Sequence, residues 1–200
     1  MKHDNETWDI VKSGWCEKIQ PAHPVVSDIL SQIPLYQINM YSRIDALLKH
    51  LRDIKWIGTH GFHSFESIIE TKKGNCLTIS CFLCSLALAM SENESYVLVA
   101  GGGLLGKTLI ATTEKHQGAY KKGYIQITVH AWMVFREKHG KIWIIDPVLM
   151  KKESLTNEID LFKRIRLAAP VDGIWLIAFD TSVLKLFSTA ASCFAFFAKR

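Results

Sequence analysis

Two β-type segments separated by a short turn constrain the fold of this chain more than any other feature. Residues 124–136 and 141–146 are rich in β-branched and aromatic side chains, a composition typical of strands. A hairpin that turns near Lys138 places His130 and Asp146 side by side, within about one residue of register, because both lie equally far from Lys138. The sequence therefore predicts an antiparallel sheet that carries a histidine–carboxylate pair.

A helical pattern begins at Cys76. Apolar residues recur with helical spacing at positions 79, 82, 83, 86, 87 and 90, and Asn75 fits the N-cap. Cys76 then lies in the first turn, where the helix macrodipole and the free backbone N–H groups favour negative charge. We expect a cysteine that ionises readily at this position, with its own backbone N–H as one oxyanion donor.

Cys76, His130 and Asp146 supply a nucleophile, a base and a residue that orients the base. A thiol attacks as a thiolate, which an imidazolium stabilises, and the imidazole needs a carboxylate to fix its tautomer. Each residue alone also has a structural explanation: a core cysteine, a satisfied strand histidine and an aspartate that starts a turn before Pro147. The combination favours a catalytic triad.

At this point the chain resembles the transglutaminase-like superfamily of cysteine enzymes. The resemblance covers about residues 40–150. It is carried by the motifs Lys72-Lys73-Gly74-Asn75-Cys76, His130-Ala131-Trp132 and Trp143-Ile144-Ile145-Asp146-Pro147, by a helix from Arg43 to Ile57, and by the segment from Ser64 that leads into the cysteine. It implies an α+β, papain-like core in which the cysteine helix packs on an antiparallel sheet that bears the histidine and the aspartate.

The same resemblance implies acyl transfer or amide hydrolysis through a thioester on Cys76. The family often takes an oxyanion donor from a side chain before the cysteine, and Trp56 is the candidate, with core packing as its alternative role. The implied substrate is a peptide, a protein or an acyl thioester, and the sequence leaves open whether water or an amine is the acceptor. A bacterial processing or biosynthetic enzyme fits better than a calcium-regulated crosslinker, because no loop has the acidic spacing of a calcium site. A transglutaminase-like binding module without catalysis is the alternative.

Three other patterns compete with this interpretation. Residues 101–108 match the phosphate-binding P-loop pattern, but the sequence that follows predicts antiparallel hairpins, so we expect a glycine-rich turn that leads into a loop over the cleft. Cys76, Cys81, Cys84 and Cys193 match a [2Fe–2S] spacing, but the first three lie in a helical segment. The histidines at 60, 63, 116 and 139 lack paired ligands at zinc spacing. We expect no cofactor and no metal.

Composition favours a single domain over residues 1–200, with an N-terminal extension (1–39), a catalytic core (40–150) and a C-terminal strand and helix (151–200). Ser42 and Asp45 indicate a helix start, Ser95–Ala100 and Gly173–Asp180 read as strands, and the apolar segment from Val183 to Ala198 predicts a packed helix rather than a membrane anchor.

Charge and cysteine content set the expected surroundings of the protein. The five cysteines are odd in number, and three of them fall in one helical segment, so we expect reduced thiols. The start of the chain has no signal-peptide pattern, which makes the cytoplasm the expected compartment. A net charge of +5 with scattered basic residues predicts no nucleic-acid partner. The oligomeric state stays open.

Overall fold

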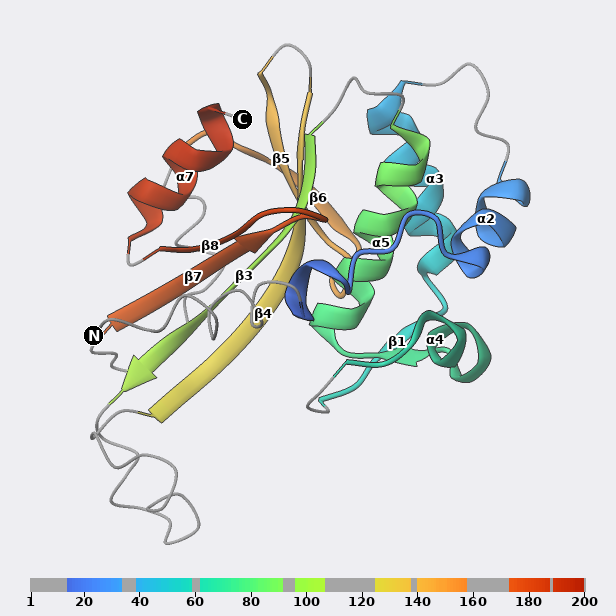
Figure 1. Cartoon of the computed structure of the whole chain (residues 1–200), viewed down its shortest axis with the longest axis horizontal. Coiled ribbons are helices and arrows are strands. Elements are labelled where there is room, and N and C mark those ends of the chain that lie inside the picture. Colours follow the sequence, from blue (N-terminus) through green and yellow to red (C-terminus); the bar gives the residue numbers. More distant parts are fainter. Residues whose placement is uncertain are drawn as a thin grey trace, which may run out of the picture.

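The computed structural model describes residues 14–33, 39–58, 62–91, 96–106, 125–137, 140–157, 173–187 and 189–199. It mixes helices and strands in an α+β arrangement (Figure 1). The helices are α2 (Pro24–Ser31), α3 (Met40–Leu51), α4 (Phe65–Thr71), α5 (Cys76–Met90) and α7 (Ala190–Lys199). The strands are β1 (Lys55–Trp56), β2 (Lys73–Gly74), β3 (Tyr96–Gly106), β4 (Ile125–Arg136), β5 (Ile142–Asp146), β6 (Lys151–Leu155), β7 (Gly173–Phe179) and β8 (Leu184–Phe187).

Six of these strands form one sheet in the order β6-β5-β4-β3-β7-β8, and every neighbouring pair is antiparallel. The hairpin predicted from the sequence is the β4–β5 pair. It closes through a turn in which Gly140 has φ +87°, a left-handed conformation that glycine adopts without steric cost. A separate, parallel pair is formed by β1 and β2.

Helices cover both faces of the sheet (Figure 1). Helix α5 packs against β3 and β4, with α2, α3 and α4 around it, whereas α7 packs against β7 and β8. Alternate residues of β4 serve two cores: Met133 and Phe135 belong to the core with α5, while Trp132 and Val134 belong to the core with α7. Helix α5 lies between the sheet and the other helices, so it is buried nearly all round after its first turn.

The helix expected from Arg43 to Ile57 differs from the one in the structure. Helix α3 begins at Met40 because Asn39, rather than Ser42, is the N-cap; its side chain accepts from the Ser42 N–H at 2.9 Å. The helix ends at Leu51 because the chain then turns into β1, whose backbone pairs with β2.

The prediction of a glycine-rich turn at residues 101–106 is wrong. These residues continue β3 and pair with β4 on one side, and residues 101–105 also pair with β7 on the other. Their extended backbone is already used in two ladders, so residues 101–106 do not form the phosphate-cradling loop of a P-loop protein. Lys107 and Thr108 lie outside the described residues.

The apolar C-terminal segment forms a strand and then a helix, where one helix from Val183 was expected. The Asp180 carboxylate accepts from the backbone N–H of Ser182 at 2.7 Å and of Val183 at 2.8 Å. This tight turn reverses the chain, so β8 pairs with β7 before α7 begins. None of the helices in the described part of the chain has the length and apolar character needed to cross a membrane.

Candidate active site

Helix α5, which begins at Cys76, has a well-defined start. The Asn75 side chain accepts from the backbone N–H and from the hydroxyl of Thr78, at 2.9 and 2.8 Å. The Thr78 hydroxyl in turn accepts from the backbone N–H of His63 at 3.2 Å, which ties the segment before α4 to the helix. As predicted, Cys76 is the first residue of α5, and its own N–H has no acceptor within the helix.

A close approach of β2 to α5 fixes the chain just before the nucleophile. A Cβ atom at Gly74 would lie 2.8 Å from Cγ1 of Ile79, a distance that real Cβ contacts do not show. Gly74 therefore allows β2 to lie directly against the first turns of α5. Strand β1 completes this unit, since Trp56 pairs with Gly74.

His130 and Asp146 form the expected pair, with Nε2 of the ring 2.8 Å from Oδ2 of the carboxylate. The register differs from the prediction by two residues. The last bridge between β4 and β5 joins Met133 to Ile145, so Asp146 continues opposite Trp132 and His130 lies diagonally across. The two side chains meet just beyond the last bridge of the hairpin.

The Asp146 carboxylate is fixed by both of its oxygens. Oδ1 accepts from the backbone N–H of Val148 at 3.0 Å and of Leu149 at 3.1 Å, while Oδ2 faces His130. One side chain thus makes both the turn contacts and the histidine contact considered from the sequence, while its orienting role in catalysis stays a prediction. Its side chain is 2% exposed. Burial alone would raise the pKa of this carboxyl, but the His130 hydrogen bond and charge and the two backbone donors hold the pKa below its ordinary value.

The Cys76 thiol lies against His130. Burial opposes ionisation, but the His130 side chain, its positive charge and the backbone N–H groups of Ala131 and Leu77 stabilise the thiolate, and together they lower the pKa of Cys76 below its ordinary value. Since Nε2 of His130 faces Asp146, Nδ1 is the ring nitrogen left for the thiol. The contact between Sγ of Cys76 and the His130 ring thus joins helix α5 to the β4–β5 hairpin.

The pKa of His130 shifts in the direction opposite to that of Cys76. Burial favours the neutral imidazole, yet the hydrogen bonds to Asp146 and Cys76 and their negative charges raise the pKa of His130 to about 9. A lowered thiol pKa beside a raised imidazole pKa favours a thiolate–imidazolium pair over the neutral thiol–imidazole pair. Such a pair can attack a carbonyl carbon without a separate deprotonation step.

The other cysteines differ from Cys76 in burial and in charge. Cys81 and Cys84 are fully buried in α5, and burial raises the pKa of both thiols. Burial likewise raises the pKa of Cys193 to about 12. On a regular helix Cys81 points about 140° away from Cys76, so the cysteines of α5 do not face one common point, as a [2Fe–2S] cluster would require.

Among the residues that the structure describes, no three His, Cys, Asp or Glu side chains gather in a way that could hold a metal ion. Of the histidines considered for zinc, only His63 lies in the described part of the chain; His60, His116 and His139 lie outside it.

Trp56 lies in β1, which pairs with the strand that leads to Cys76, and its side chain is 54% exposed. It therefore does not pack in the core, which was its alternative role. Within the described residues, its hydrogen bonds include none to Cys76, His130 or Asp146, so its role as an oxyanion donor stays a prediction.

Sequence reasoning missed the backbone donors of the site. The N–H groups of Ala131 and Leu77 reach the thiolate, and those of Val148 and Leu149 reach Asp146. Only the second pair had a sequence signal, because an aspartate before proline commonly accepts from the backbone of the turn that follows. In comparisons with protein-family models, curated proteins and solved structures, no match to this chain was found.

Proposed function

We propose that this protein is a cysteine-dependent acyltransferase or amide hydrolase of the transglutaminase-like type, with Cys76, His130 and Asp146 as its triad. One observation carries the proposal: a buried carboxylate lies 2.8 Å from Nε2 of a histidine whose other side lies against a thiol of lowered pKa. The three residues come from a helix start, a strand and a strand end, far apart in sequence. If Cys76 were only a small core residue, the fold would not need the polar contacts that join Cys76, His130 and Asp146.

In the proposed reaction, Sγ of Cys76 attacks the carbonyl carbon of an amide, a peptide or a thioester. The C–S bond forms while the carbonyl electrons move to oxygen, and the first-turn N–H of Cys76 is placed to donate to that oxyanion. Collapse of the intermediate breaks the bond to the leaving group, which takes a proton from His130 and leaves a thioester on Cys76. Water or an amine then attacks the thioester, His130 takes its proton, and the C–S bond breaks.

The acceptor decides the product. Water gives an acid, so the protein acts as a peptidase or amidase, and an amine gives a new amide bond. Asp146 keeps the imidazole oriented through both halves of the cycle, because its own position is set by the backbone of the turn after β5. The transglutaminase-like assignment rests on these residues and on the α+β core around them.

The direct test is capture of the thioester. The protein is incubated with a panel of peptide amides and acyl thioesters, digested, and mapped by mass spectrometry for an acyl group on Cys76. We expect an adduct on Cys76, its loss in Cys76→Ala, and normal formation in the matched control Cys16→Ala. Near-native turnover by Cys76→Ala would rule out the mechanism. Fast alkylation of Cys76 without an acyl adduct from any donor would favour the non-catalytic binding module.

A further inference from the structure

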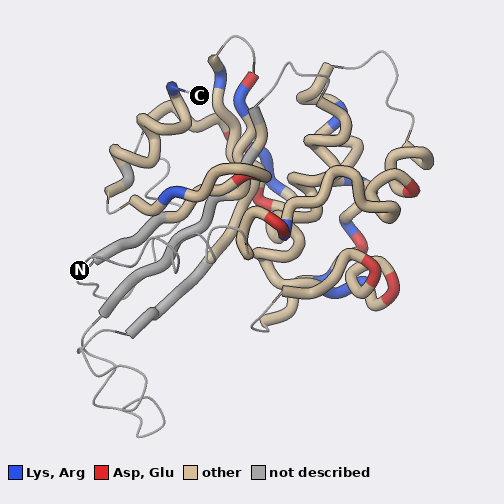
Figure 2. Tube along the Cα trace, viewed as in Figure 1, with Lys and Arg blue, Asp and Glu red and all other residues tan. Residues whose placement is uncertain are grey.

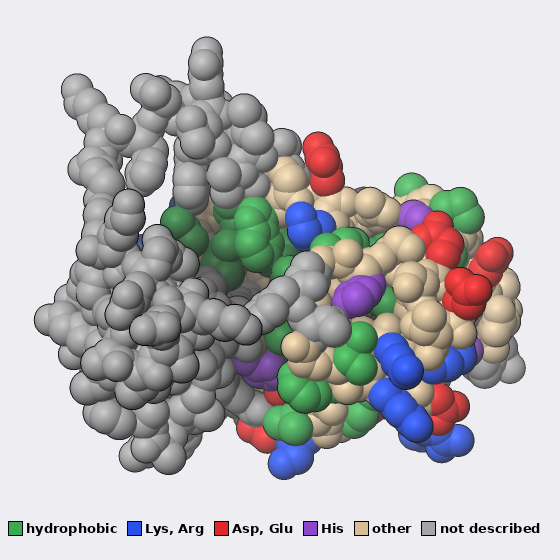
Figure 3. Space-filling view, turned by 90° about the horizontal axis from the view of Figure 1, so that it is seen from below, with side chains coloured by type: hydrophobic (Ala, Val, Ile, Leu, Met, Phe, Trp, Pro, Cys, Tyr) green, Lys and Arg blue, Asp and Glu red, His purple; other side chains and the backbone are tan. Residues whose placement is uncertain are grey.

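A group of basic side chains lies at one end of the molecule, close to the segment that leads into Cys76. Its members, which we call the basic end, are all exposed: Lys49, Arg52, Lys55, Lys72 and Lys73. They come from the end of α3, from β1, from the end of α4 and from β2. Figure 2 shows Lys and Arg positions where the end of α3 meets these strands, and Figure 3 shows basic side chains gathered on this part of the surface.

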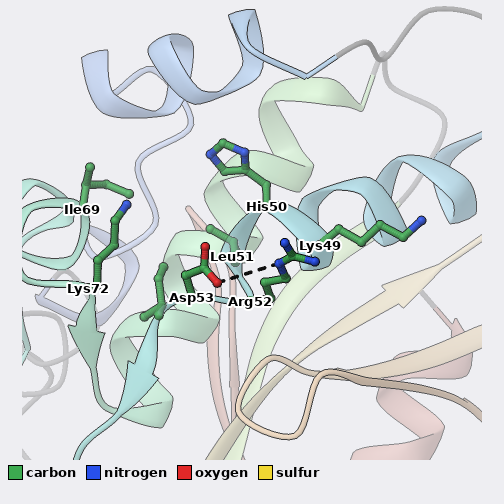
Figure 4. Close-up of a pocket in the computed structure, with 8 residues that line it drawn as sticks. Lys49, His50, Leu51, Arg52, Asp53, Ile69 and Lys72 are labelled. Carbon is green, nitrogen blue, oxygen red and sulfur yellow. Dashed lines mark ion pairs between the residues drawn. The ribbon is translucent and has the colours of Figure 1, made fainter.

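Part of the basic end lines a hollow of about 300 Å³ (Figure 4). Lys72 and Asp53 border this hollow, and an ion pair joins Nε of Arg52 to Oδ1 of Asp53 at 3.8 Å. Both partners of this ion pair are more than 70% exposed, so the pair is weak. In the described part of the chain, Lys49, Lys55, Lys72 and Lys73 form no ion pair with a carboxylate.

Two features of the basic end oppose local stability. Lys55 lies directly opposite Lys73 in the β1–β2 pair, and like charges in register on neighbouring strands destabilise the pairing. Lys72 ends α4 with φ +54°, a left-handed conformation that glycine adopts at lower cost. An acid at position 55 or 73, or a glycine at position 72, would relieve these costs, so the fold alone does not explain the lysines.

The basic end is also connected to the nucleophile. Lys73 precedes Cys76 by three residues, and an extended chain covers at most about 10 Å over that length. A polypeptide whose carbonyl group reaches Sγ of Cys76 and which continues across β2 and β1 therefore passes Lys73 and then Lys55. Lys73 and its register partner Lys55 are thus the members of the basic end that residues a few positions away from the reacting carbonyl would meet.

We propose that the basic end binds an acidic segment of the peptide or protein that presents its acyl group to Cys76. This assignment rests on the proposed function and adds the class of substrate to it: an acyl donor with carboxylates a few residues from the reactive carbonyl. A nucleic acid fits less well, because Trp56 is the one exposed large aromatic side chain that the described residues place beside these cations, and a row of such rings is needed to stack successive bases.

The test measures binding separately from chemistry. A fluorescein-labelled, glutamate-rich peptide is titrated into the full-length Cys76→Ala variant, and fluorescence anisotropy gives the dissociation constant. The same titration is repeated with the double variant Cys76→Ala/Lys55→Glu. Lys55→Glu places a carboxylate opposite Lys73, so we expect a higher thermal midpoint together with peptide binding weakened by about threefold to tenfold. Lys185→Glu on β8 carries the same charge change and is the matched control, with binding expected to stay as it was.

A second variant also separates the effect of lost charge on peptide binding from any loss of stability. Lys72→Gly removes a cation and relieves the left-handed backbone, so it is also expected to raise the thermal midpoint and weaken the peptide. The assignment would be overturned if all variants bound the peptide with equal affinity, or if Lys185→Glu weakened peptide binding as much as Lys55→Glu does. If a single-stranded oligonucleotide of matched charge bound more tightly than the peptide, the ligand class would be a nucleic acid instead. If thioester capture on Cys76 succeeds while the peptide fails to bind, only this inference falls; if capture fails while the peptide binds, the proposed function falls.

Discussion

At the scale of single residues, the site depends on side chains that each serve two neighbours. Asp146 accepts from the turn with one oxygen and faces His130 with the other, and His130 lies between Asp146 and the thiol. Because both partners of His130 carry negative charge, the imidazolium is the favoured form of the ring until the pH approaches 9. The lowered pKa of Cys76 and the raised pKa of His130 both favour a proton on the histidine and a negative charge on the sulfur.

Replacing Asp146 by asparagine tests the orienting role. The amide can keep the two backbone hydrogen bonds to the turn, but it cannot stabilise the imidazolium, so the pKa of His130 is expected to fall from about 9 toward its ordinary value. By analogy with serine triads, turnover should drop on the order of 10⁴-fold. NMR titration of His130 and the measured kcat/KM give the two readouts, and an unchanged pKa of His130 would argue against this role.

The pKa directions also predict a pH window for acyl transfer. The thiolate forms as pH rises through the lowered pKa of Cys76, and the imidazolium is lost as pH rises through about 9. Activity should therefore rise at a pH below the ordinary thiol pKa and fall on the alkaline side near pH 9, since His130 can then no longer protonate an amine leaving group. Measuring kcat/KM across pH gives the profile, and activity that keeps rising above that pH would contradict the assignment.

The three side chains of the site could be predicted because short stretches of sequence mark them. A helix start precedes the cysteine, and one hairpin carries both the histidine and the aspartate. The exact register could not be predicted from counting alone. The Gly140 turn shifts the pairing so that Trp132, rather than His130, continues opposite Asp146. The amides that reach the sulfur depend on how α5 and β4 pack, and no local signal records that packing.

At the scale of elements, the start of α5 positions the nucleophile, and its cap can be tested. Asn75→Ala removes the acceptor of two hydrogen bonds from Thr78, with an expected cost of about 1 kcal/mol in the free energy of unfolding. It should also slow alkylation of Cys76, because the first turn of α5 loses its fixed geometry.

The matched control is Ser64→Ala, which removes the cap of α4 at a similar cost in stability. Urea unfolding measures the first effect and peptide mapping measures the second. We expect only Asn75→Ala to change the alkylation rate; equal rates in the two variants would show that the cap stabilises the helix without positioning the thiol.

Helix and strand types were predictable where the pattern of apolar residues is periodic, as in α5 and β4. Predictions failed where tertiary pairing decides the conformation. Trp56 was placed in a helix by its neighbours, but β2 pairs with that segment; Gly101–Gly106 read as a turn, but two neighbouring strands hold them extended. Such pairings join residues far apart in sequence, so local propensity does not reveal them.

At the scale of the whole molecule, the site exists only in the folded chain, since helix α5 and the β4–β5 hairpin must pack together to form it. Unfolding in urea should therefore remove the reactivity of Cys76 at weakly acidic pH. It should at the same time expose Cys81 and Cys84, whose pKa values burial keeps high in the folded state. Labelling across the urea transition, followed by peptide mapping, checks both changes; independent midpoints would mean that the site does not depend on the core.

The rate at which iodoacetamide alkylates Cys76, measured as a function of pH, tests whether the folded chain stabilises the Cys76 thiolate through His130. We expect an inflection below the ordinary thiol value of about 8.5, faster labelling of Cys76 than of Cys16 or Cys193 at about pH 6, and an inflection that moves up in His130→Ala. An inflection near the ordinary value in both proteins, or faster labelling of Cys16 or Cys193, would contradict it.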